Sequence, residues 1–148
     1  MKKTIGIWIL LLVFFNLHAQ TEVTTNTKNS SKAEIIFETL IHDYGTVTVD
    51  ASGLYNFKFK NTGTEPLILS NVITTCGCTV PDWPKEPILP GKSGVIQINY
   101  TRMTTPGVIN KQVKVISNAK NGDIILNIKG YILSKKEEKK LIKTKNSN

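Results

Sequence analysis

Residues 55–60 read Tyr-Asn-Phe-Lys-Phe-Lys, and this stretch gives the clearest indication of the fold class. Aromatic side chains at 55, 57 and 59 alternate with polar side chains at 56, 58 and 60. Because successive side chains of a strand point to opposite faces of a sheet, the alternation predicts a strand with one aromatic face and one wet face.

Outward from this strand, the same period of two recurs between turn signals. Residues 66–73, 96–101 and 124–132 are further strand candidates. Turn-forming residues separate them about every ten residues, as in the stretches 61–64, 90–94, 105–107 and 121–122. Seven or so short strands within about 100 residues predict an all-β protein with a Greek-key β-sandwich.

The apolar positions of these strands define the expected core. The two cysteines are too close in sequence to join two sheets, as the disulfide of an antibody domain does, so the core must depend on apolar packing. We expect it to contain Phe57, Phe59, Leu67, Leu69, Ile96, Ile98, Val113, Val115, Leu126 and Ile128.

Composition divides the chain into four segments. Residues 1–19 have two lysines, an apolar run and a short polar end, the order of a secretory signal peptide. Residues 20–32 are expected to be a disordered linker, residues 33–133 the β-sandwich, and residues 134–148 a basic disordered tail. The apolar run is shorter than the roughly 20 residues that a membrane span needs. We therefore expect a protein exported to the periplasm or the cell exterior, with no membrane span in the mature chain.

The positive charge is concentrated at the two ends of the chain. The formal charge of +8 includes two leader lysines and a net +4 after residue 134, which leaves +2 for residues 4–134. A nearly neutral folded part argues against a nucleic-acid partner, because nucleic-acid binding proteins present a basic surface to the phosphates.

Five ordered motifs occur in the central part of the chain: HDYGTV at 42–47, FKFKNTG at 57–63, PLI at 66–68, CGCT at 76–79 and ILPG at 88–91. In these motifs, and over about residues 37–132, the chain closely resembles the family known as domain of unknown function 1573. The resemblance implies an immunoglobulin-like sandwich of the kind common in exported bacterial proteins, similar in shape to sperm-protein and chaperone domains. It implies no activity. Tyr44 is a departure, because phenylalanine is usual there.

Cys76 and Cys78, the only cysteines, are separated by Gly77 alone. In an extended strand, residues i and i+2 lie about 6.6 to 6.8 Å apart, at the upper limit for a disulfide. Gly77 can adopt backbone angles that bring the sulfurs closer. Closing so small a ring contributes only about 1.6 kcal/mol in the chain-entropy model. A bond here would be a weak staple and easily reduced, so the two cysteines are a candidate redox pair.

Two other interpretations of the cysteine pair stay open. Two thiolates on one face suit copper(I), whereas zinc fits less well because a structural zinc site needs four ligands. Alternatively, both cysteines are small apolar residues buried at the end of a strand. The spacing alone does not decide among a redox pair, a soft-metal site and packing residues.

The segment after Cys78 contains prolines at 81, 84, 87 and 90. Because proline lacks the donor that a central strand needs, we expect a loop or an edge strand here. Trp83 lies in this segment and is a candidate binding surface or, alternatively, a lid that packs on the core.

The chain carries no nucleophile elbow and no glycine-rich phosphate loop, which argues against an enzyme. Our leading hypothesis is an exported, non-enzymatic module without a cofactor. It would bind another envelope component or secreted protein through its loops or an open sheet edge. The alternative hypothesis is a thiol-disulfide redox or copper(I)-binding role at Cys76 and Cys78.

Overall fold

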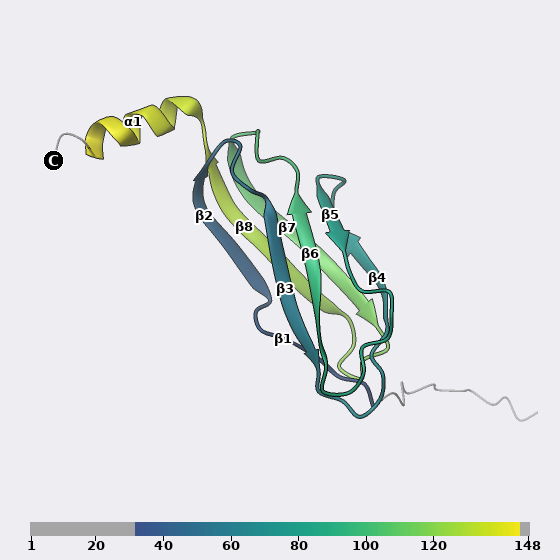
Figure 1. The fold of residues 1–148 in the computed structure, drawn as a ribbon. Helices are drawn as coiled ribbons and strands as arrows, with labels where there is room; N and C mark the ends of the chain where they lie inside the picture. Colours follow the sequence, from purple (N-terminus) through teal and green to yellow (C-terminus); the bar gives the residue numbers. More distant parts are fainter. Residues whose placement is uncertain (1–31, 146–148) are drawn as a thin grey trace, which may run out of the picture.

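The computed structural model describes residues 32–145. The expected signal peptide at 1–19 and nearly all of the expected linker at 20–32 lie outside these residues. Eight strands and one helix follow one another in the described chain (Figure 1): β1 (Ile35–Phe37), β2 (Ile41–Thr48), β3 (Leu54–Asn61), β4 (Leu69–Thr74), β5 (Thr79–Asp82), β6 (Ser93–Tyr100), β7 (Gly107–Ser117), β8 (Ile124–Leu133) and α1 (Lys135–Lys145).

The strands form two sheets of four strands that face each other (Figure 1). One sheet has the order β1-β3-β6-β5 and the other the order β2-β8-β7-β4. The pair β2–β8 is parallel, and every other neighbouring pair in the described sheets is antiparallel. The predicted all-β sandwich is confirmed, with eight strands where about seven were expected.

The core lies between the two sheets and follows the alternation of the sequence. Phe57 and Phe59 point inward from β3 and are at most 2% exposed, whereas Asn56 and Lys58 on the same strand are exposed. Burying each such aromatic side chain contributes about 1.5–3 kcal/mol, which fixes the face of β3 that turns inward. All ten residues predicted for the core are buried: Phe57, Phe59, Leu67, Leu69, Ile96, Ile98, Val113, Val115, Leu126 and Ile128.

The strands β1 and β2 are consecutive in the chain but belong to different sheets. β1 pairs with residues 59–61 of β3, and the Glu38 N–H extends this pairing by donating to the Lys58 carbonyl at 3.0 Å. The chain then bends at Leu40, whose carbonyl accepts from the Asn127 N–H in the other sheet at 2.8 Å. As a result, β1 covers only the last part of β3.

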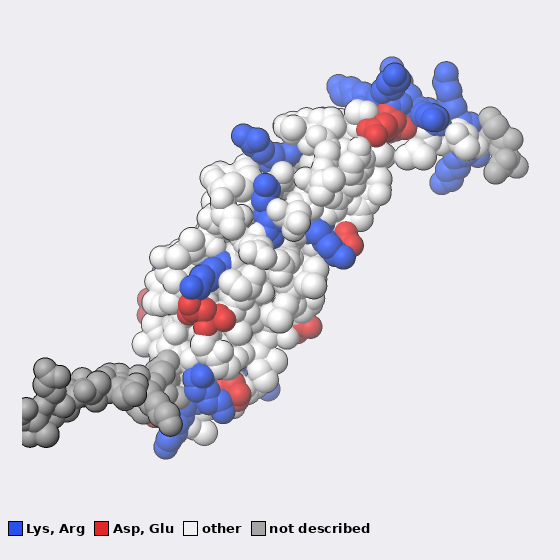
Figure 2. All heavy atoms as spheres, turned by 180° about the vertical axis from the view of Figure 1, so that it is seen from behind, with Lys and Arg blue, Asp and Glu red and all other residues white. Residues whose placement is uncertain are grey.

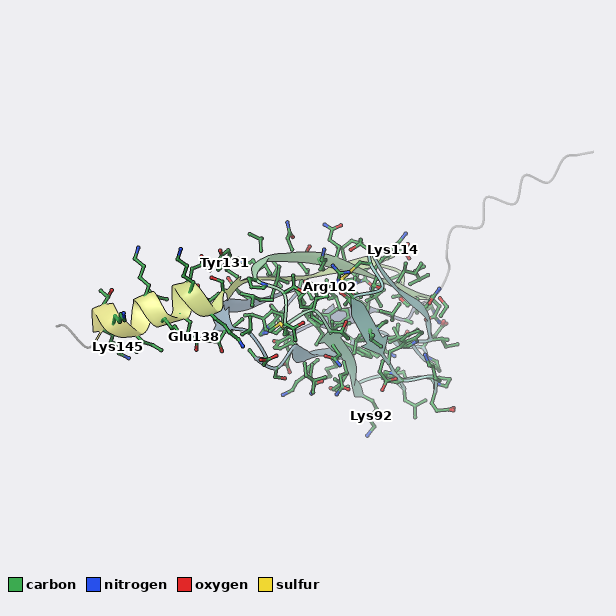
Figure 3. The ribbon with its side chains drawn as sticks, turned by 90° about the horizontal axis from the view of Figure 1, so that it is seen from above. Lys92, Arg102, Lys114, Tyr131, Glu138 and Lys145 are labelled. Carbon is green, nitrogen blue, oxygen red and sulfur yellow. A yellow bond between two sulfur atoms is a disulfide. The ribbon has the colours of Figure 1, made fainter. Side chains whose placement is uncertain are left out.

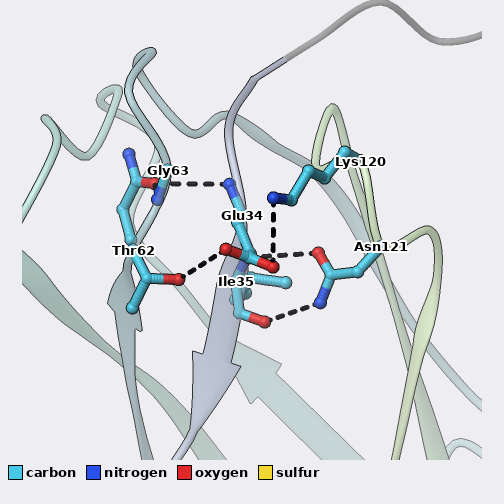
Figure 4. A network of polar contacts seen from close by, with 7 residues as sticks. Glu34, Ile35, Thr62, Gly63, Lys120 and Asn121 are labelled. Carbon is cyan, nitrogen blue, oxygen red and sulfur yellow. Dashed lines mark hydrogen bonds and ion pairs between the residues drawn. The ribbon is translucent and has the colours of Figure 1, made fainter.

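A network of side chains fixes the start of β1 (Figure 4). The Asn121 side chain accepts from the Ile35 N–H at 3.2 Å and donates to the Ile35 carbonyl at 2.8 Å. The Glu34 carboxylate accepts from the Thr62 hydroxyl at 3.1 Å and lies 3.4 Å from the Lys120 ammonium. Because Asn121 belongs to the turn between β7 and β8, the network ties β1 to both sheets.

The C-terminal tail differs from the prediction of disorder, because Lys135–Lys145 form helix α1. The Ser134 hydroxyl accepts from the Glu137 N–H at 3.3 Å, and the Glu137 carboxylate accepts from the Ser134 N–H at 2.8 Å. This reciprocal capping box satisfies main-chain donors at the start of the helix. The helix extends away from the sandwich (Figure 1) and bears the densest group of lysines in the view of Figure 2.

Candidate functional site

The turn between β4 and β5 is one place on the sandwich that combines exposed polar groups with a hollow. Cys76 and Cys78 lie in this turn, are half-buried, and are joined by a disulfide, with Cα atoms 5.2 Å apart. This distance is shorter than the spacing in an extended strand because the chain turns at Gly77. The interpretation of the cysteines as buried packing residues with free thiols is therefore wrong.

Hydrogen bonds hold the main chain at both cysteines. The Cys76 carbonyl accepts from the Thr74 hydroxyl at 3.1 Å and from the Thr79 N–H at 3.4 Å. The Cys78 carbonyl accepts from the Thr101 N–H at 2.9 Å and from the Thr101 hydroxyl at 3.2 Å. The Thr79 hydroxyl also lies 3.7 Å from Cys76 Sγ and is the donor, because a disulfide sulfur carries no proton. The turn is thus shaped by contacts other than the disulfide.

The disulfide borders an open hollow of about 510 Å³ at one end of the sandwich. The other walls come mainly from the connection between β6 and β7, which includes Arg102, labelled in Figure 3. Arg102 and Lys111 are the charged residues among those that line the hollow, and no carboxylate is among them. The hollow therefore favours an anion over a cation.

Lys111 occupies an unusual place on β7. Residues two apart share a face of a strand, and the neighbours of Lys111 on its face, Ile109 and Val113, are at most 1% exposed. Thr74 at the end of β4 pairs with Val113, so the continuing register brings Cys76 level with Lys111. A lysine at an apolar position of the sequence pattern is the signal that could have identified this residue.

Residues 32–145 offer the cysteine pair no cluster of further ligands for a soft metal ion. No group of three or more His, Cys, Asp and Glu side chains in these residues could hold a metal ion. Cys76 and Cys78 are bonded to each other, so neither sulfur is a thiolate ligand in this form of the protein. Copper(I) would therefore require the reduced pair.

Trp83 lies just after β5, which is an edge strand, as the prolines of this segment predict. The Trp83 ring is half-buried and packs against the core, and the Lys85 ammonium lies 2.9 Å from the ring centroid. These contacts favour the role of a lid, because the ring has the core on one side and a cation over its face.

Another such place is the edge of β3 beyond the end of β1. At the even-numbered residues Lys58 and Thr62, the main-chain groups bond toward the segment that contains β1. At the odd-numbered residues Gly53 and Asn61, the main-chain groups bond toward β6 and the chain next to it. Because the direction alternates along a strand, the N–H and C=O of Asn56 point to the β1 side. There β1 has already left the sheet, so among residues 32–145 these two groups have no strand partner and lie on an open edge.

A hollow of about 420 Å³ lies beside this open edge, between residues 38–39 and the start of β3. Leu54 lines the hollow and is 47% exposed, and the Lys58 side chain lines it as well. Unpaired main-chain groups on a sheet edge are a template for another strand. An open sheet edge was a predicted mode of binding, but no pattern in the sequence shows where it lies.

An aromatic cluster closes the sandwich behind the open edge. The His42 ring stacks on the Tyr55 ring with centroids 3.5 Å apart, and the Tyr44 ring meets His42 edge-on at 4.4 Å. The Tyr44 hydroxyl donates to the Gly53 carbonyl at 2.6 Å. Burial, with a contribution from Tyr100, raises the pKa of Tyr44 to about 12. Tyrosine at this position thus makes a bond that phenylalanine could not make.

His42 gives the protein an expected pH dependence. Burial lowers the pKa of His42 below 6.5, although Asp43 acts in the opposite direction. The unfolded chain therefore takes up a proton at a pH at which folded His42 stays neutral. We expect the free energy of unfolding to be fully retained above about pH 6.5 and to decrease as the pH falls toward the lower pKa of the folded state.

Urea unfolding at several pH values from about 7.5 to 5 measures this dependence. The His42→Phe variant keeps a ring on Tyr55 and is expected to lose the part of the dependence that lies in this window. An equally steep decrease in the variant would show that other groups cause it. Asp43 has a lowered pKa, chiefly because it accepts from the Gly45 N–H, so it titrates at more acidic pH.

The residues described contain no helix with the length and apolar character of a membrane span. A family model described as protein of unknown function (DUF1573) matches residues 35–132. No curated protein matches the chain.

Several solved structures share the fold. A protein of unknown function from Porphyromonas gingivalis W83 is 17% identical, with a TM-score of 0.58, over 67% of this chain and 46% of that one. The Vibrio cholerae VesB protease is 9% identical, with a TM-score of 0.52, over 73% of this chain and 33% of that one. The secreted serine protease VesC of Vibrio cholerae is 16% identical, with a TM-score of 0.50, over 68% of this chain and 23% of that one. The chain spans less than half the length of each, and at these identities the likeness concerns the fold alone.

Proposed function

Because the chain belongs to the family described as protein of unknown function (DUF1573), which names no activity, we propose a function from the geometry of its surface. The protein is an exported, non-enzymatic module that binds an extended segment of another envelope or secreted protein. The segment adds to the β1-β3-β6-β5 sheet as a further strand along the open edge of β3.

The observation that carries this proposal is the outward-facing main chain of Asn56. Its N–H and C=O point to the side where β1 would lie if it did not leave the sheet after Phe37. An incoming strand would meet these groups directly and would continue the line of β1. Such main-chain bonds supply affinity that does not depend on the side chains of the partner segment.

Side chains around the hollow indicate which segments fit best. Leu54 and Lys58 lie on the outer face of β3, on either side of Asn56. A strand added here would place alternate residues beside them. An apolar residue next to Leu54 and an acidic residue next to Lys58 complement the surface. An added strand would also cover the edge of the sandwich in front of the stacked rings of His42 and Tyr55.

Two substitutions of one residue test the proposal. Asn56→Pro removes the outward N–H and the side chain that accepts from Gln97 Nε2 at 3.2 Å, but no main-chain bond to β6, and a proline is tolerated in a strand at such an edge. Asn56→Ala keeps the main chain and loses the same bond to Gln97, so the two variants differ only in the main chain. For extended peptides selected from a random library on the unchanged protein, we expect the proline variant to lose at least about tenfold in affinity. The alanine variant is expected to bind nearly as well as the unchanged protein.

Titration by calorimetry measures the affinities, and hydrogen exchange of the peptide complex gives a second readout. Binding is expected to slow exchange at the amide of Asn56, which faces the open edge. Equal affinity of the two variants, protection confined to another part of the surface, or a library without binders would each refute strand addition at β3.

A further inference from the structure

We infer that the Cys76–Cys78 disulfide is a thiol-disulfide exchange site for anionic thiols, meaning thiols with negative charge close to the sulfur. This site is separate from the open edge of β3, because none of the residues that line its hollow lines the hollow beside that edge. The inference therefore does not depend on the proposed binding of an extended segment.

The disulfide is poorly placed to serve as a structural staple. It closes a ring of three residues, and the stabilisation that a disulfide gives by restricting the unfolded chain is smallest for the shortest loops. Thr74 and Thr79 already hold the Cys76 carbonyl, and Thr101 holds the Cys78 carbonyl. Opening the sulfur–sulfur bond therefore leaves the turn with its other contacts.

The surroundings of the disulfide suit an attacking thiolate. Both cysteines are half-buried and border the open hollow, so an incoming sulfur can reach them. Arg102 and Lys111 place two cations in the walls of that hollow, and none of the residues in 32–145 that line it carries a carboxylate. Positive charge raises the local concentration of anions and stabilises thiolates. Lys111 projects from the apolar face of β7 between Ile109 and Val113, a position at which packing alone favours an apolar residue.

The exchange is balanced in atoms and electrons. A substrate thiolate attacks Cys78 Sγ, a bond forms between these sulfurs, and the Cys76–Cys78 bond breaks. Cys76 leaves as a thiolate and accepts a hydrogen bond from the Thr79 hydroxyl, which lies 3.7 Å away. A second substrate thiolate then attacks the substrate sulfur of the mixed disulfide, and Cys78 leaves as a thiolate. The substrate gives up two electrons and two protons and becomes a disulfide, and the cysteine pair becomes two thiols.

The test compares two small thiols of opposite charge on the full chain. Reduced glutathione carries carboxylates, whereas cysteamine carries an ammonium group. Samples are quenched with acid at intervals and alkylated, and intact mass gives the fraction of opened disulfide, with each rate expressed per thiolate. We expect both thiols to open the disulfide in the folded protein, with the rate for glutathione reduced by added salt.

The double variant Arg102→Gln, Lys111→Met removes both cations and is expected to lower the ratio of the glutathione rate to the cysteamine rate roughly threefold to tenfold. Lys92→Gln is the matched control, because Lys92 does not line the hollow and points away from the sandwich (Figure 3). The control is expected to keep the ratio of the unchanged protein.

Three results would overturn the inference. The first is a disulfide that opens only under denaturing conditions. The second is loss of the folded far-ultraviolet circular dichroism spectrum on reduction, which would make the bond a structural staple. The third is an unchanged rate ratio in the double variant, which would remove the selectivity for anionic thiols. None of these results bears on the Asn56 variants, so the two proposals can fail independently.

Discussion

Replacing Gly53 with alanine is expected to lower the free energy of unfolding by about 3 kcal/mol, at the upper end of the cost of overfilling a packed site. A Cβ atom at this position would overlap the Tyr100 carbonyl oxygen and would lie 3.1 Å from Met103 Cγ. The Tyr100 oxygen belongs to the main chain of β6 and cannot move aside like the end of a flexible side chain. The Gly53 carbonyl is also fixed, by the Tyr100 N–H at 2.9 Å and the Tyr44 hydroxyl at 2.6 Å.

Gly77→Ala is the matched control for this prediction. A Cβ atom on Gly77 would meet no heavy atom within 4 Å. We expect this variant to change the free energy of unfolding by no more than about 0.5 kcal/mol. Urea unfolding of both variants measures the difference. Similar stability of the two variants would mean that the chain near Gly53 can shift away from Tyr100 at little cost.

The role of Gly53 was not predictable from the sequence, although the strand that follows it was. The alternation at residues 55–60 is local, because burying one face of a strand requires apolar side chains at every second position. It therefore identified Phe57 and Phe59 as core residues without knowledge of their neighbours. The close approach at Gly53 depends on Tyr100, which is distant in sequence. Contacts of that kind depend on the topology and leave no local pattern.

The candidate sites divide in the same way. Spacing identified Cys76 and Cys78, because only one residue lies between them, but the cations that border their hollow come from other strands and loops. Lys111 left a weak local signal as a lysine in an apolar row. The open edge at Asn56 left none, because it depends on where β1 leaves the first sheet.

The C-terminal helix was predictable and was missed. Residues 134–137 read Ser-Lys-Lys-Glu, which matches the capping-box pattern of Ser or Thr followed three residues later by Glu or Gln. The six lysines of the tail favour a solvated, disordered end when charge alone is considered. In the structure Ser134 and Glu137 satisfy each other's main-chain N–H groups, and this local pairing starts the helix.

Asn61→Ala is expected to lower the free energy of unfolding by about 3 kcal/mol, because four main-chain groups, buried or partly buried, each lose a hydrogen bond. The Asn61 side chain is fully buried. Its amide nitrogen donates to the carbonyls of Glu65 at 2.8 Å and Ile88 at 2.9 Å. Its amide oxygen accepts from the N–H of Gly63 at 3.0 Å and of Glu34 at 3.4 Å. An alanine could make none of these bonds.

Two further variants separate hydrogen bonding from packing at this position. Asn61→Asp has almost the same shape but places a carboxylate against the carbonyl oxygens of Glu65 and Ile88, so it should destabilise the protein at least as much as Asn61→Ala at neutral pH. Asn99→Ala removes an exposed asparagine from β6 and is expected to cost no more than about 0.5 kcal/mol. If Asn61→Ala proved as mild as Asn99→Ala in urea unfolding, water would be replacing the lost bonds.

Asn61 also links stability to the proposed binding edge. It pairs with Ile35 at the start of β1 and holds Glu34 through its side chain, so its loss should loosen the strand that covers the last part of β3. A loosened β1 exposes more of the β3 edge. Hydrogen exchange of Asn61→Ala is therefore expected to become faster at the amides of Ile36 and Lys60, which pair with each other. Exchange at the paired amides of β7 and β8 should increase less, because none of the four side-chain hydrogen bonds of Asn61 goes to those strands. A uniform increase across both sheets would mean that Asn61 supports the whole sandwich rather than the β1 end of it.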